Sequence, residues 1–395
     1  MRLQLIGAGA LAAVLVSGSA LADDGPDDGP SDGPNGWRIS SDSLFYSDSD
    51  NVVVVSPQVS VHRALDDDGG SADARAVVDV VSAASVDVVS AATTRFSEVR
   101  TEVELDLAKA MGPYLPSLAI HTSHEPDYTS NGFGIGLRRN LRSSDTTLAV
   151  GYDLSLDRVG YTGTMTTAFS ESLTSHRSMV SLTQVMDPNT VVRAIWTLSV
   201  LDGYMEKPYR FVPLFDAAGL AAAENDGVVV GLDTFDRYRL DVRPPEEVPD
   251  RRVGNSLAVR GVHYLDSLPG SLRVDYQLYI DSWGILANTL EPHLSWRAAD
   301  NLIVAGYVRL YLQQAASFWQ RIYVVDRPDQ VPRWRSLDRD LSDFSAATGG
   351  ARGEWRREPL SGYVDISAME TFYSDYLYLS RRLAMVVQLG FRVDL

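Results

Sequence analysis

The chain has 395 residues, 45% of them hydrophobic and 22% charged, with 52 acidic residues against 35 basic ones and no cysteine. The formal net charge of −17 argues against a nucleic-acid partner, because phosphate binding needs clustered Lys and Arg. The lack of cysteine excludes disulfides, thiolate metal sites and a lipid anchor on a cysteine.

The first 22 residues have the pattern of a secretory signal peptide. Arg2 precedes an apolar run from Leu3 to Val16, and small residues follow up to Ala22, where we expect cleavage. The run is too short and too rich in Gly and Ala for a membrane-spanning helix, and no later stretch approaches twenty consecutive apolar residues. Cleavage removes one basic residue and no acid, which takes the net charge from −17 to −18.

Residues 23–49 are predicted to form a flexible acidic leader. From Asp23 to Gly36 the sequence repeats Asp-Asp-Gly-Pro and its variants, without an apolar residue to bury.

From Asn51 onward the apolar residues recur with a period of two, which is typical of strands. Between Thr94 and Ala108, for example, Val103 and Leu105 fall on one face and charged residues on the other. Fourteen such strands can be counted, with twelve or sixteen as alternatives. We therefore predict an all-β protein, a transmembrane antiparallel up-and-down β-barrel, over residues 50–395.

The connections alternate between short turns and longer segments, as in outer-membrane barrels. The longest predicted extracellular loops are residues 66–92, 203–251 and 315–340. A membrane-embedded sheet must close, because an open edge would leave N–H and C=O groups unpaired in lipid. The alternative is a secreted or periplasmic β-sandwich, whose connections need not alternate in length.

Residues 380–395 read as the closing strand of the barrel. Apolar residues alternate strictly from Leu383 to the final Leu395. This resembles the terminal strand that the barrel-assembly machinery recognises, although that signal usually ends in Phe. The expected partners are this machinery and outer-membrane lipid, and the expected location is the outer membrane of a Gram-negative bacterium.

Aromatic residues near the predicted strand ends would form girdles at the membrane interfaces. They are Trp196, Trp283, Trp296, Tyr363, Tyr373, Tyr376 and Tyr378.

Charged residues on the face opposite lipid either line a pore that selects solutes or pair across strands and brace a filled lumen. They are Glu98, Arg100, Glu102, Glu104, Arg138, Arg193, Arg260, Arg273, Asp275, Arg309, Arg392 and Asp394. An eight-residue repeat, 78–85 and 86–93, places Asp79 and Asp87 equivalently. They could lie on a constriction loop inside the lumen, although a hairpin or short extra strands capping the barrel are favoured. No cofactor or metal site is predicted.

Three segments carry a resemblance to a known family. They are the repeat with the following Arg95–Arg100, Ser123–Tyr128, and Ala316–Trp319. On these residues the chain resembles a family of uncharacterised, porin-like bacterial outer-membrane proteins, known only as a domain of unknown function. The resemblance implies the barrel and no activity.

The predicted function is therefore a non-enzymatic outer-membrane channel for an unidentified small solute or ion. One alternative is an outer-membrane lipid hydrolase in which His124 activates Ser130, six residues along the chain. Another is a non-conducting barrel that captures partners through residues 203–251 and 315–340.

Overall fold

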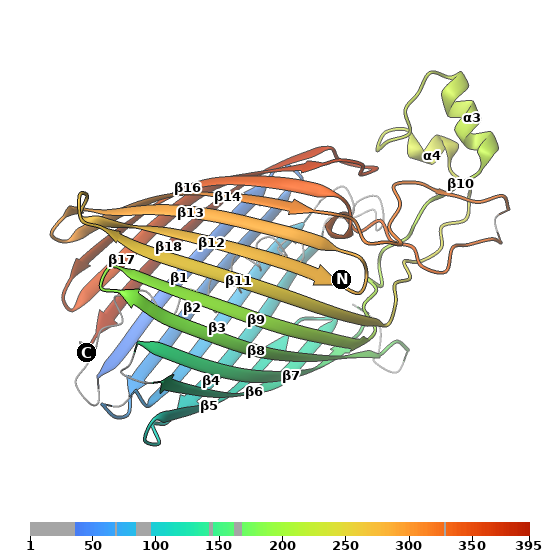
Figure 1. Ribbon diagram of the computed structural model, residues 1–395. Coiled ribbons are helices and arrows are strands. Elements are labelled where there is room, and N and C mark those ends of the chain that lie inside the picture. Colours follow the sequence, from blue (N-terminus) through green and yellow to red (C-terminus); the bar gives the residue numbers. More distant parts are fainter. Residues whose placement is uncertain (1–35, 68, 84–95, 142–144, 162–167, 328) are drawn as a thin grey trace.

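A computed structural model describes residues 36–67, 69–83, 96–141, 145–161, 168–327 and 329–395. Within them, sixteen antiparallel strands close into one barrel, so the predicted fold class is confirmed (Figure 1). The barrel strands are β1 (Trp37–Asp48), β2 (Val52–Ala64), β3 (Ser71–Ala83), β4 (Phe96–Ala108), β5 (Tyr114–His124), β6 (Tyr128–Leu141), β7 (Thr146–Val159), β8 (Glu171–Asp187), β9 (Thr190–Gly203), β11 (Arg251–Leu265), β12 (Gly270–Asp281), β13 (Leu286–Ala299), β14 (Leu302–Gln313), β16 (Phe344–Arg357), β17 (Leu360–Tyr373) and β18 (Arg381–Asp394). The predicted signal peptide and residues 23–35 lie outside the described residues.

The strands alternate between an apolar outer face and a polar inner face. On β4, Val99, Val103 and Leu105 are each 44–48% exposed on the outside, while Glu102 and Glu104 lie on the inner face. These outward apolar side chains are exposed in the isolated chain, and in a membrane lipid would cover them. Within the described part of the chain, no helix is long and apolar enough to cross a membrane.

The barrel closes where its first strand pairs with its last. Arg38 is paired with Asp394 and the register continues to Asp48 opposite Ala384. The seam is extended at one end by two backbone hydrogen bonds between Trp37 and Leu395, at 3.0 and 2.8 Å. On β18, Leu383, Met385 and Phe391 face outward, as the alternation in residues 380–395 predicts.

The prediction of fourteen strands is wrong by two, and sixteen was one of its alternatives. Residues 37–48 of the predicted leader form β1, whose four serines and two aspartates interrupt the apolar alternation. Residues 71–83 of the predicted loop 66–92 form β3, in which Val77, Val78, Val80 and Val81 place apolar side chains on both faces. The period of two is lost in both segments, yet each pairs along its length with both neighbours.

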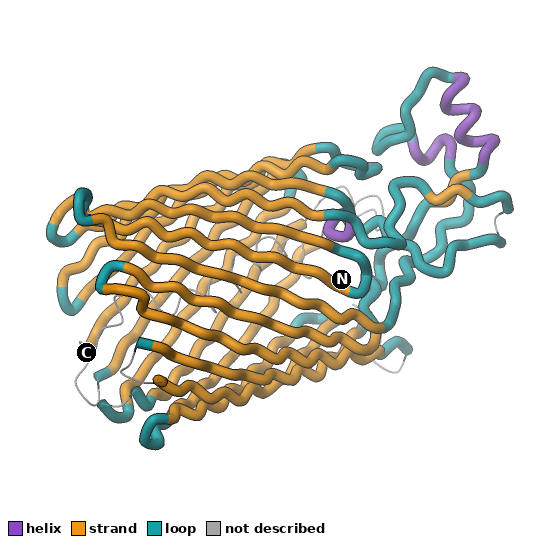
Figure 2. The backbone as a smooth tube through the Cα atoms, viewed as in Figure 1, coloured by secondary structure: helices purple, strands orange, loops and turns teal. Residues whose placement is uncertain are grey.

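The long connections gather at one end of the barrel, opposite the end that holds the chain's last residue (Figure 2). Residues 204–250 and 314–343 fold together there into what we call the loop unit. It contains helices α3 (Ala217–Asn225) and α4 (Phe235–Tyr238), the 3-10 helix η1 (Arg339–Leu341), and the parallel pair β10 (Leu214–Phe215) and β15 (Tyr323–Val324).

The loop unit has a hydrophobic core of its own, which the sequence prediction of surface loops missed. Val212, Leu214 and Phe215 are fully buried, and Tyr323 is 1% exposed. Five of the seven aromatic residues predicted for the interface girdles do not face lipid. Trp283, Tyr373, Tyr376 and Tyr378 belong to this core, and Tyr363 faces the barrel interior. Only Trp196 and Trp296 lie exposed on the outer face.

Buried ion pairs connect the two segments of the loop unit and fix it to the barrel. Asp338 lies 2.7 Å from Lys207 Nζ and 2.6 Å from Arg210 Nη1, and Arg339 pairs with Asp50 in the turn between β1 and β2. Burial disfavours the charged carboxylate, but Arg210 and Lys207 outweigh it and hold the pKa of Asp338 below its usual range. The ion pairs of Asp338 are therefore present at neutral pH and are lost only as the pH falls through that lowered pKa.

Deleting residues 36–48 should prevent closure, because it removes β1 and leaves β2 and β18 each with an unpaired edge. The deletion variant is expected to lose the difference in gel migration between unboiled and boiled samples that a closed barrel shows. Deleting residues 23–35 keeps all sixteen strands and is the control, which should keep the difference. Heat-dependent migration of the chain without β1 would contradict this account of closure.

Asp338→Asn should loosen the loop unit, since it removes the carboxylate that Lys207 and Arg210 share and leaves Arg210 its longer contact of 3.4 Å with Glu246. Removing one partner of a buried pair costs about 3–5 kcal/mol. Hydrogen exchange in residues 204–250 and 314–343 should accelerate accordingly. The matched control is Asp236→Asn, whose ion pair with Arg239 leaves Asp236 69% exposed, where such a pair contributes about 0–1 kcal/mol. Equal exchange in the two variants would rule out the proposed role of Asp338.

Candidate functional site

The inner face of the barrel is the candidate site. All twelve charged residues predicted to line a pore lie on it, opposite the exposed apolar side chains: Glu98, Arg100, Glu102, Glu104, Arg138, Arg193, Arg260, Arg273, Asp275, Arg309, Arg392 and Asp394. The structure brings most of them into two clusters on different sides of the wall. Glu98, Arg138, Arg193, Arg392 and Asp394 lie outside both clusters, and their role in conduction stays a prediction.

The first cluster spans β11, β12 and β13. Arg260 on β11 donates two hydrogen bonds to Asp275 on β12, from Nε at 2.6 Å and from Nη2 at 3.0 Å. Arg273 lies 3.2 Å from the same carboxylate and reaches His293 Nε2 on β13 at 2.6 Å. The register explains these contacts. Arg260 is directly opposite Asp275, and Arg273 is directly opposite His293.

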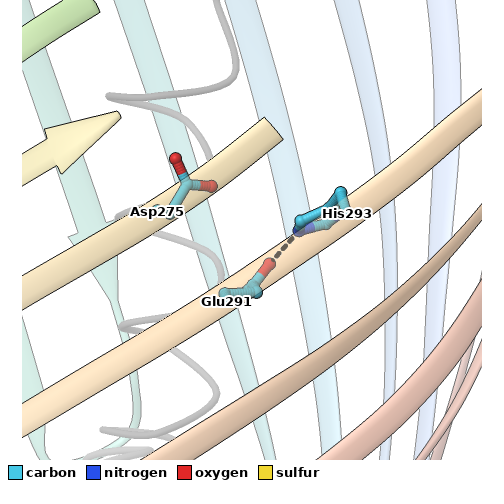
Figure 3. Close-up of side chains that lie close together, drawn as sticks. All are labelled: Asp275, Glu291 and His293. Carbon is cyan, nitrogen blue, oxygen red and sulfur yellow. Dashed lines mark hydrogen bonds and ion pairs between the residues drawn. The ribbon is translucent and has the colours of Figure 1, made fainter. Parts of the chain in front are cut away.

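The cluster continues from β13 to β14 and β17. Figure 3 shows His293 bonded to Glu291, with Asp275 on the neighbouring strand. The His293 ring stacks on Tyr307, with ring centroids 4.8 Å apart, and the Tyr307 hydroxyl donates to Asp365 at 2.8 Å. Arg309 lies 3.7 Å from Glu291.

Asp275, Glu291 and His293 bring three potential metal ligands within 4.8 Å of one another. Three arginines surround them, however: Arg260 and Arg273 pair with Asp275, and Arg309 pairs with Glu291. These guanidinium groups already supply the positive charge that a cation would bring. The arrangement therefore favours a fixed polar network that offers arginine donors to the lumen.

The second cluster lies on β3 and β4. Arg75 donates to Glu104 at 3.0 Å and to Glu102 at 3.2 Å, while Arg100 pairs with Asp79 at 3.3 Å and with Glu102. Each cluster keeps an arginine accessible from the interior, since the side chains of Arg75 and Arg273 are 35% and 32% exposed, whereas Arg260 and Arg309 are 14% and 8% exposed. The inner wall at these positions is thus polar and open to solvent.

The predicted constriction loop around Asp79 is not a loop. Asp79 lies on β3, within the barrel wall, and accepts a hydrogen bond from Ser56 on β2. Residues 78–83 of the repeat belong to a full strand of the wall because β2 and β4 pair with it on both sides, so the favoured interpretation of short extra strands capping the barrel is also wrong for these residues. Asp87 lies outside the described residues.

A third group of carboxylates lies at the rim, where Glu98, Glu125 and Asp127 bring their oxygens within 4.8 Å of one another. All three side chains are buried. Tyr209 of the loop unit donates to Asp127 at 3.0 Å, so this group also connects the loop unit to the turn between β5 and β6.

The structure does not support the predicted dyad of His124 and Ser130. His124 is paired with Thr129 and contacts its hydroxyl on the outer face at 3.1 Å. Ser130 is paired with Ser123 and donates to Asp157 on the inner face at 2.8 Å. A turn separates the two strands and resets the alternation, so the two side chains point to opposite sides of the sheet.

Several residues of the first cluster were absent from the predicted site, among them Glu291, His293 and Asp365. Tyr307 lies on the inner face of its strand, but alternation alone does not identify its stacking partner His293. One usable signal was Gly350 on β16: a Cβ there would lie 2.2 Å from Cζ of Tyr307. The glycine thus leaves space for the aromatic ring.

Gly350→Ala should displace Tyr307, because the added methyl group overlaps its ring. The expected cost is about 1–3 kcal/mol, as for other overpacked sites. Gly349→Ala is the matched control, since a Cβ at this neighbouring outward position meets no atom within 4 Å. The denaturant midpoint of the refolded barrel should fall for the first variant only. Equal denaturant midpoints would show that Tyr307 can move without a loss of stability.

Comparison with known proteins gives a family. A family model described as "Protein of unknown function (DUF3570)" matches residues 88–374. No curated protein matches the chain. Similar solved structures include CdiB from Acinetobacter baumannii, with 9% identity, a TM-score of 0.48 and coverage of 90% of this chain. The chain spans 60% of the length of that structure.

Two further structures are similar over nearly their whole length. A bacterial polysaccharide outer membrane secretin has 7% identity and a TM-score of 0.49, with 92% of this chain and 98% of that chain covered. The outer membrane protein OprD from Pseudomonas aeruginosa has 6% identity and a TM-score of 0.39, with 91% and 94% covered. At such values we infer nothing about activity from these three proteins.

Proposed function

We propose that this chain, which belongs to the family described as "Protein of unknown function (DUF3570)", forms a water-filled channel for small polar solutes in a bacterial outer membrane. The observation that carries the proposal is the combination of sixteen strands with an inner wall of accessible charged side chains. Barrels of about eight strands fill their interior with side chains, whereas those of about 16–18 strands leave room for an aqueous channel.

The chemistry of the wall supports a passage for polar solutes. Charged groups such as Arg75 and Arg273 would lose much of their hydration in a dry interior, at a cost of several kcal/mol for each ion. Their side chains keep about a third of their surface accessible, which favours an interior that holds water. Rings of such charges set the solute preference of a pore.

A catalytic role has less support. The hydrolase alternative requires His124 and Ser130 to meet, and their strands direct them to opposite faces of the sheet. Ser130 instead contacts a carboxylate, Asp157, and the hydroxyl of Ser155. Neither contact supplies the histidine that this alternative requires to activate the serine.

The test is the conductance of the refolded protein in planar bilayers, where discrete current steps are expected. Ala258→Trp on β11 should lower the step size, because residue 258 shares the inner face with Arg260 and the indole would occupy lumen volume. Val259→Trp is the matched control, since Val259 faces outward and its step size should equal that of the unaltered protein. The channel proposal fails if the refolded, heat-modifiable barrel carries no current.

A further inference from the structure

Four strands of the barrel, β17, β18, β1 and β2, carry nearly balanced charge on the inner face, with three arginines and four carboxylates. The rest of the inner face is divided into two arcs of opposite charge. On strands β3 to β7 it carries eight carboxylates and three arginines: Asp73, Asp79, Glu98, Glu102, Glu104, Asp106, Asp153 and Asp157 with Arg75, Arg100 and Arg138. We call this set the acidic arc. It has an excess of five negative charges.

On the strands from β8 to β16 of the barrel, the balance is reversed. Their inner face carries nine arginines and five carboxylates: Arg177, Arg193, Arg252, Arg260, Arg273, Arg297, Arg309, Arg352 and Arg356 with Glu171, Asp275, Asp281, Glu291 and Glu354. We call this set the basic arc. The first cluster of the candidate site, around Asp275, lies at its centre.

The two arcs face each other across the lumen. In the ring of sixteen strands, β4 and β13 are separated by eight steps in either direction, so they lie on opposite sides. β4 carries Glu102 and Glu104, and β13 lies between the strands of Arg273 and Arg309.

The centres of the arcs also lie at the same depth. We start at Glu291 and step through β14 around the ring, each time to the residue directly opposite on the next strand. This path reaches Phe96 on β4. The same steps from Glu291 through β12, in the other direction, reach a position just beyond the end of β4, near Gly112. Because the strands tilt, each half-circuit shifts the depth equally and in opposite senses. The midpoint on β4 is Glu104, which is therefore level with Glu291.

We propose that the two arcs create an electric field across the lumen and that the channel prefers small zwitterions, solutes that carry an ammonium and a carboxylate group. The inference rests on the channel function proposed above. A zwitterion aligns its carboxylate toward the arginines of the basic arc and its ammonium toward the carboxylates of the acidic arc. An ion of a single charge is attracted to one wall and repelled by the other.

The physical environment strengthens this field. The barrel wall and the surrounding lipid have a low dielectric constant, which focuses field lines into the aqueous lumen. Mobile ions screen the field over about 8 Å at physiological ionic strength and over about 3 Å at 1 M salt. The preference for zwitterions should therefore weaken at high salt, whereas a preference based on pore size would not.

The test compares two isomers in proteoliposome swelling, zwitterionic β-alanine and uncharged lactamide, which have the same atomic composition. The unaltered channel should pass β-alanine faster. Two double variants, Glu102→Gln with Glu104→Gln and Arg260→Gln with Arg309→Gln, should each lower the ratio of the two rates by about twofold or more. In planar bilayers under a salt gradient, their reversal potentials should shift in opposite directions.

Asp236→Asn is the control, because it removes a negative charge, as the Glu→Gln substitutions do, from α4 of the loop unit, outside the lumen. It should change neither the ratio of rates nor the reversal potential. If a double variant does not refold, the loss of the preference at 1 M salt in the unaltered protein tests the same field.

The outcomes separate the two proposals. If the proteoliposomes pass neither isomer and bilayers carry no current, the channel function is wrong. If both isomers pass at equal rates at low salt, or the double variants shift the reversal potential in the same direction, the charge separation has no role and the channel function stands.

Discussion

The structure depends on one constraint: inside a lipid bilayer, every backbone N–H and C=O group must find its partner within the protein. Sixteen strands meet this condition only because β1 and β18 pair along eleven residues and leave no edge. Closure explains why β1 is a strand despite its serines, since its backbone bonds to two neighbours whatever its side chains are. It also fixes the inside and the outside of the wall, because each strand then has one face toward lipid and one toward the lumen. The polar inner surface is a consequence of this division.

Ion pairing on that inner surface is shaped by the register between strands. Arg260 meets Asp275, and Arg75 meets Glu104, because each pair occupies directly opposed positions on adjacent strands. Such pairs hold the long arginine side chains against the wall and away from the centre of the lumen. They do not cancel the charge of each arc, since carboxylates outnumber arginines on β3 to β7 and the reverse holds from β8 to β16. The same network therefore braces the barrel and leaves a residual field.

The loop unit, outside the membrane, folds around a hydrophobic core. Its core of Leu214, Phe215 and Tyr323 continues into the barrel's end through Trp283 and Phe344. Burial raises the pKa of Tyr323 to about 12, and its hydroxyl donates to backbone carbonyls of the unit. Buried ion pairs at Asp338 and Asp50 add fixed connections. The unit is thus anchored at several points of one rim, which positions it beside the opening of the proposed channel.

The sequence by itself determined the fold class, the outward face of the last strand and the inward direction of twelve charged residues, because alternation with a period of two is a local property of the chain. It did not reveal β1 or β3, whose residues break that period and become strands through long-range pairing. The alternative that joined His124 to Ser130 is not supported, since a turn between the strands exchanges the faces. The partners of Asp275, the core of the loop unit and the opposition of the two charged arcs were decided only by the tertiary structure. Each depends on register and closure around a ring, and these properties relate residues that lie far apart in the chain.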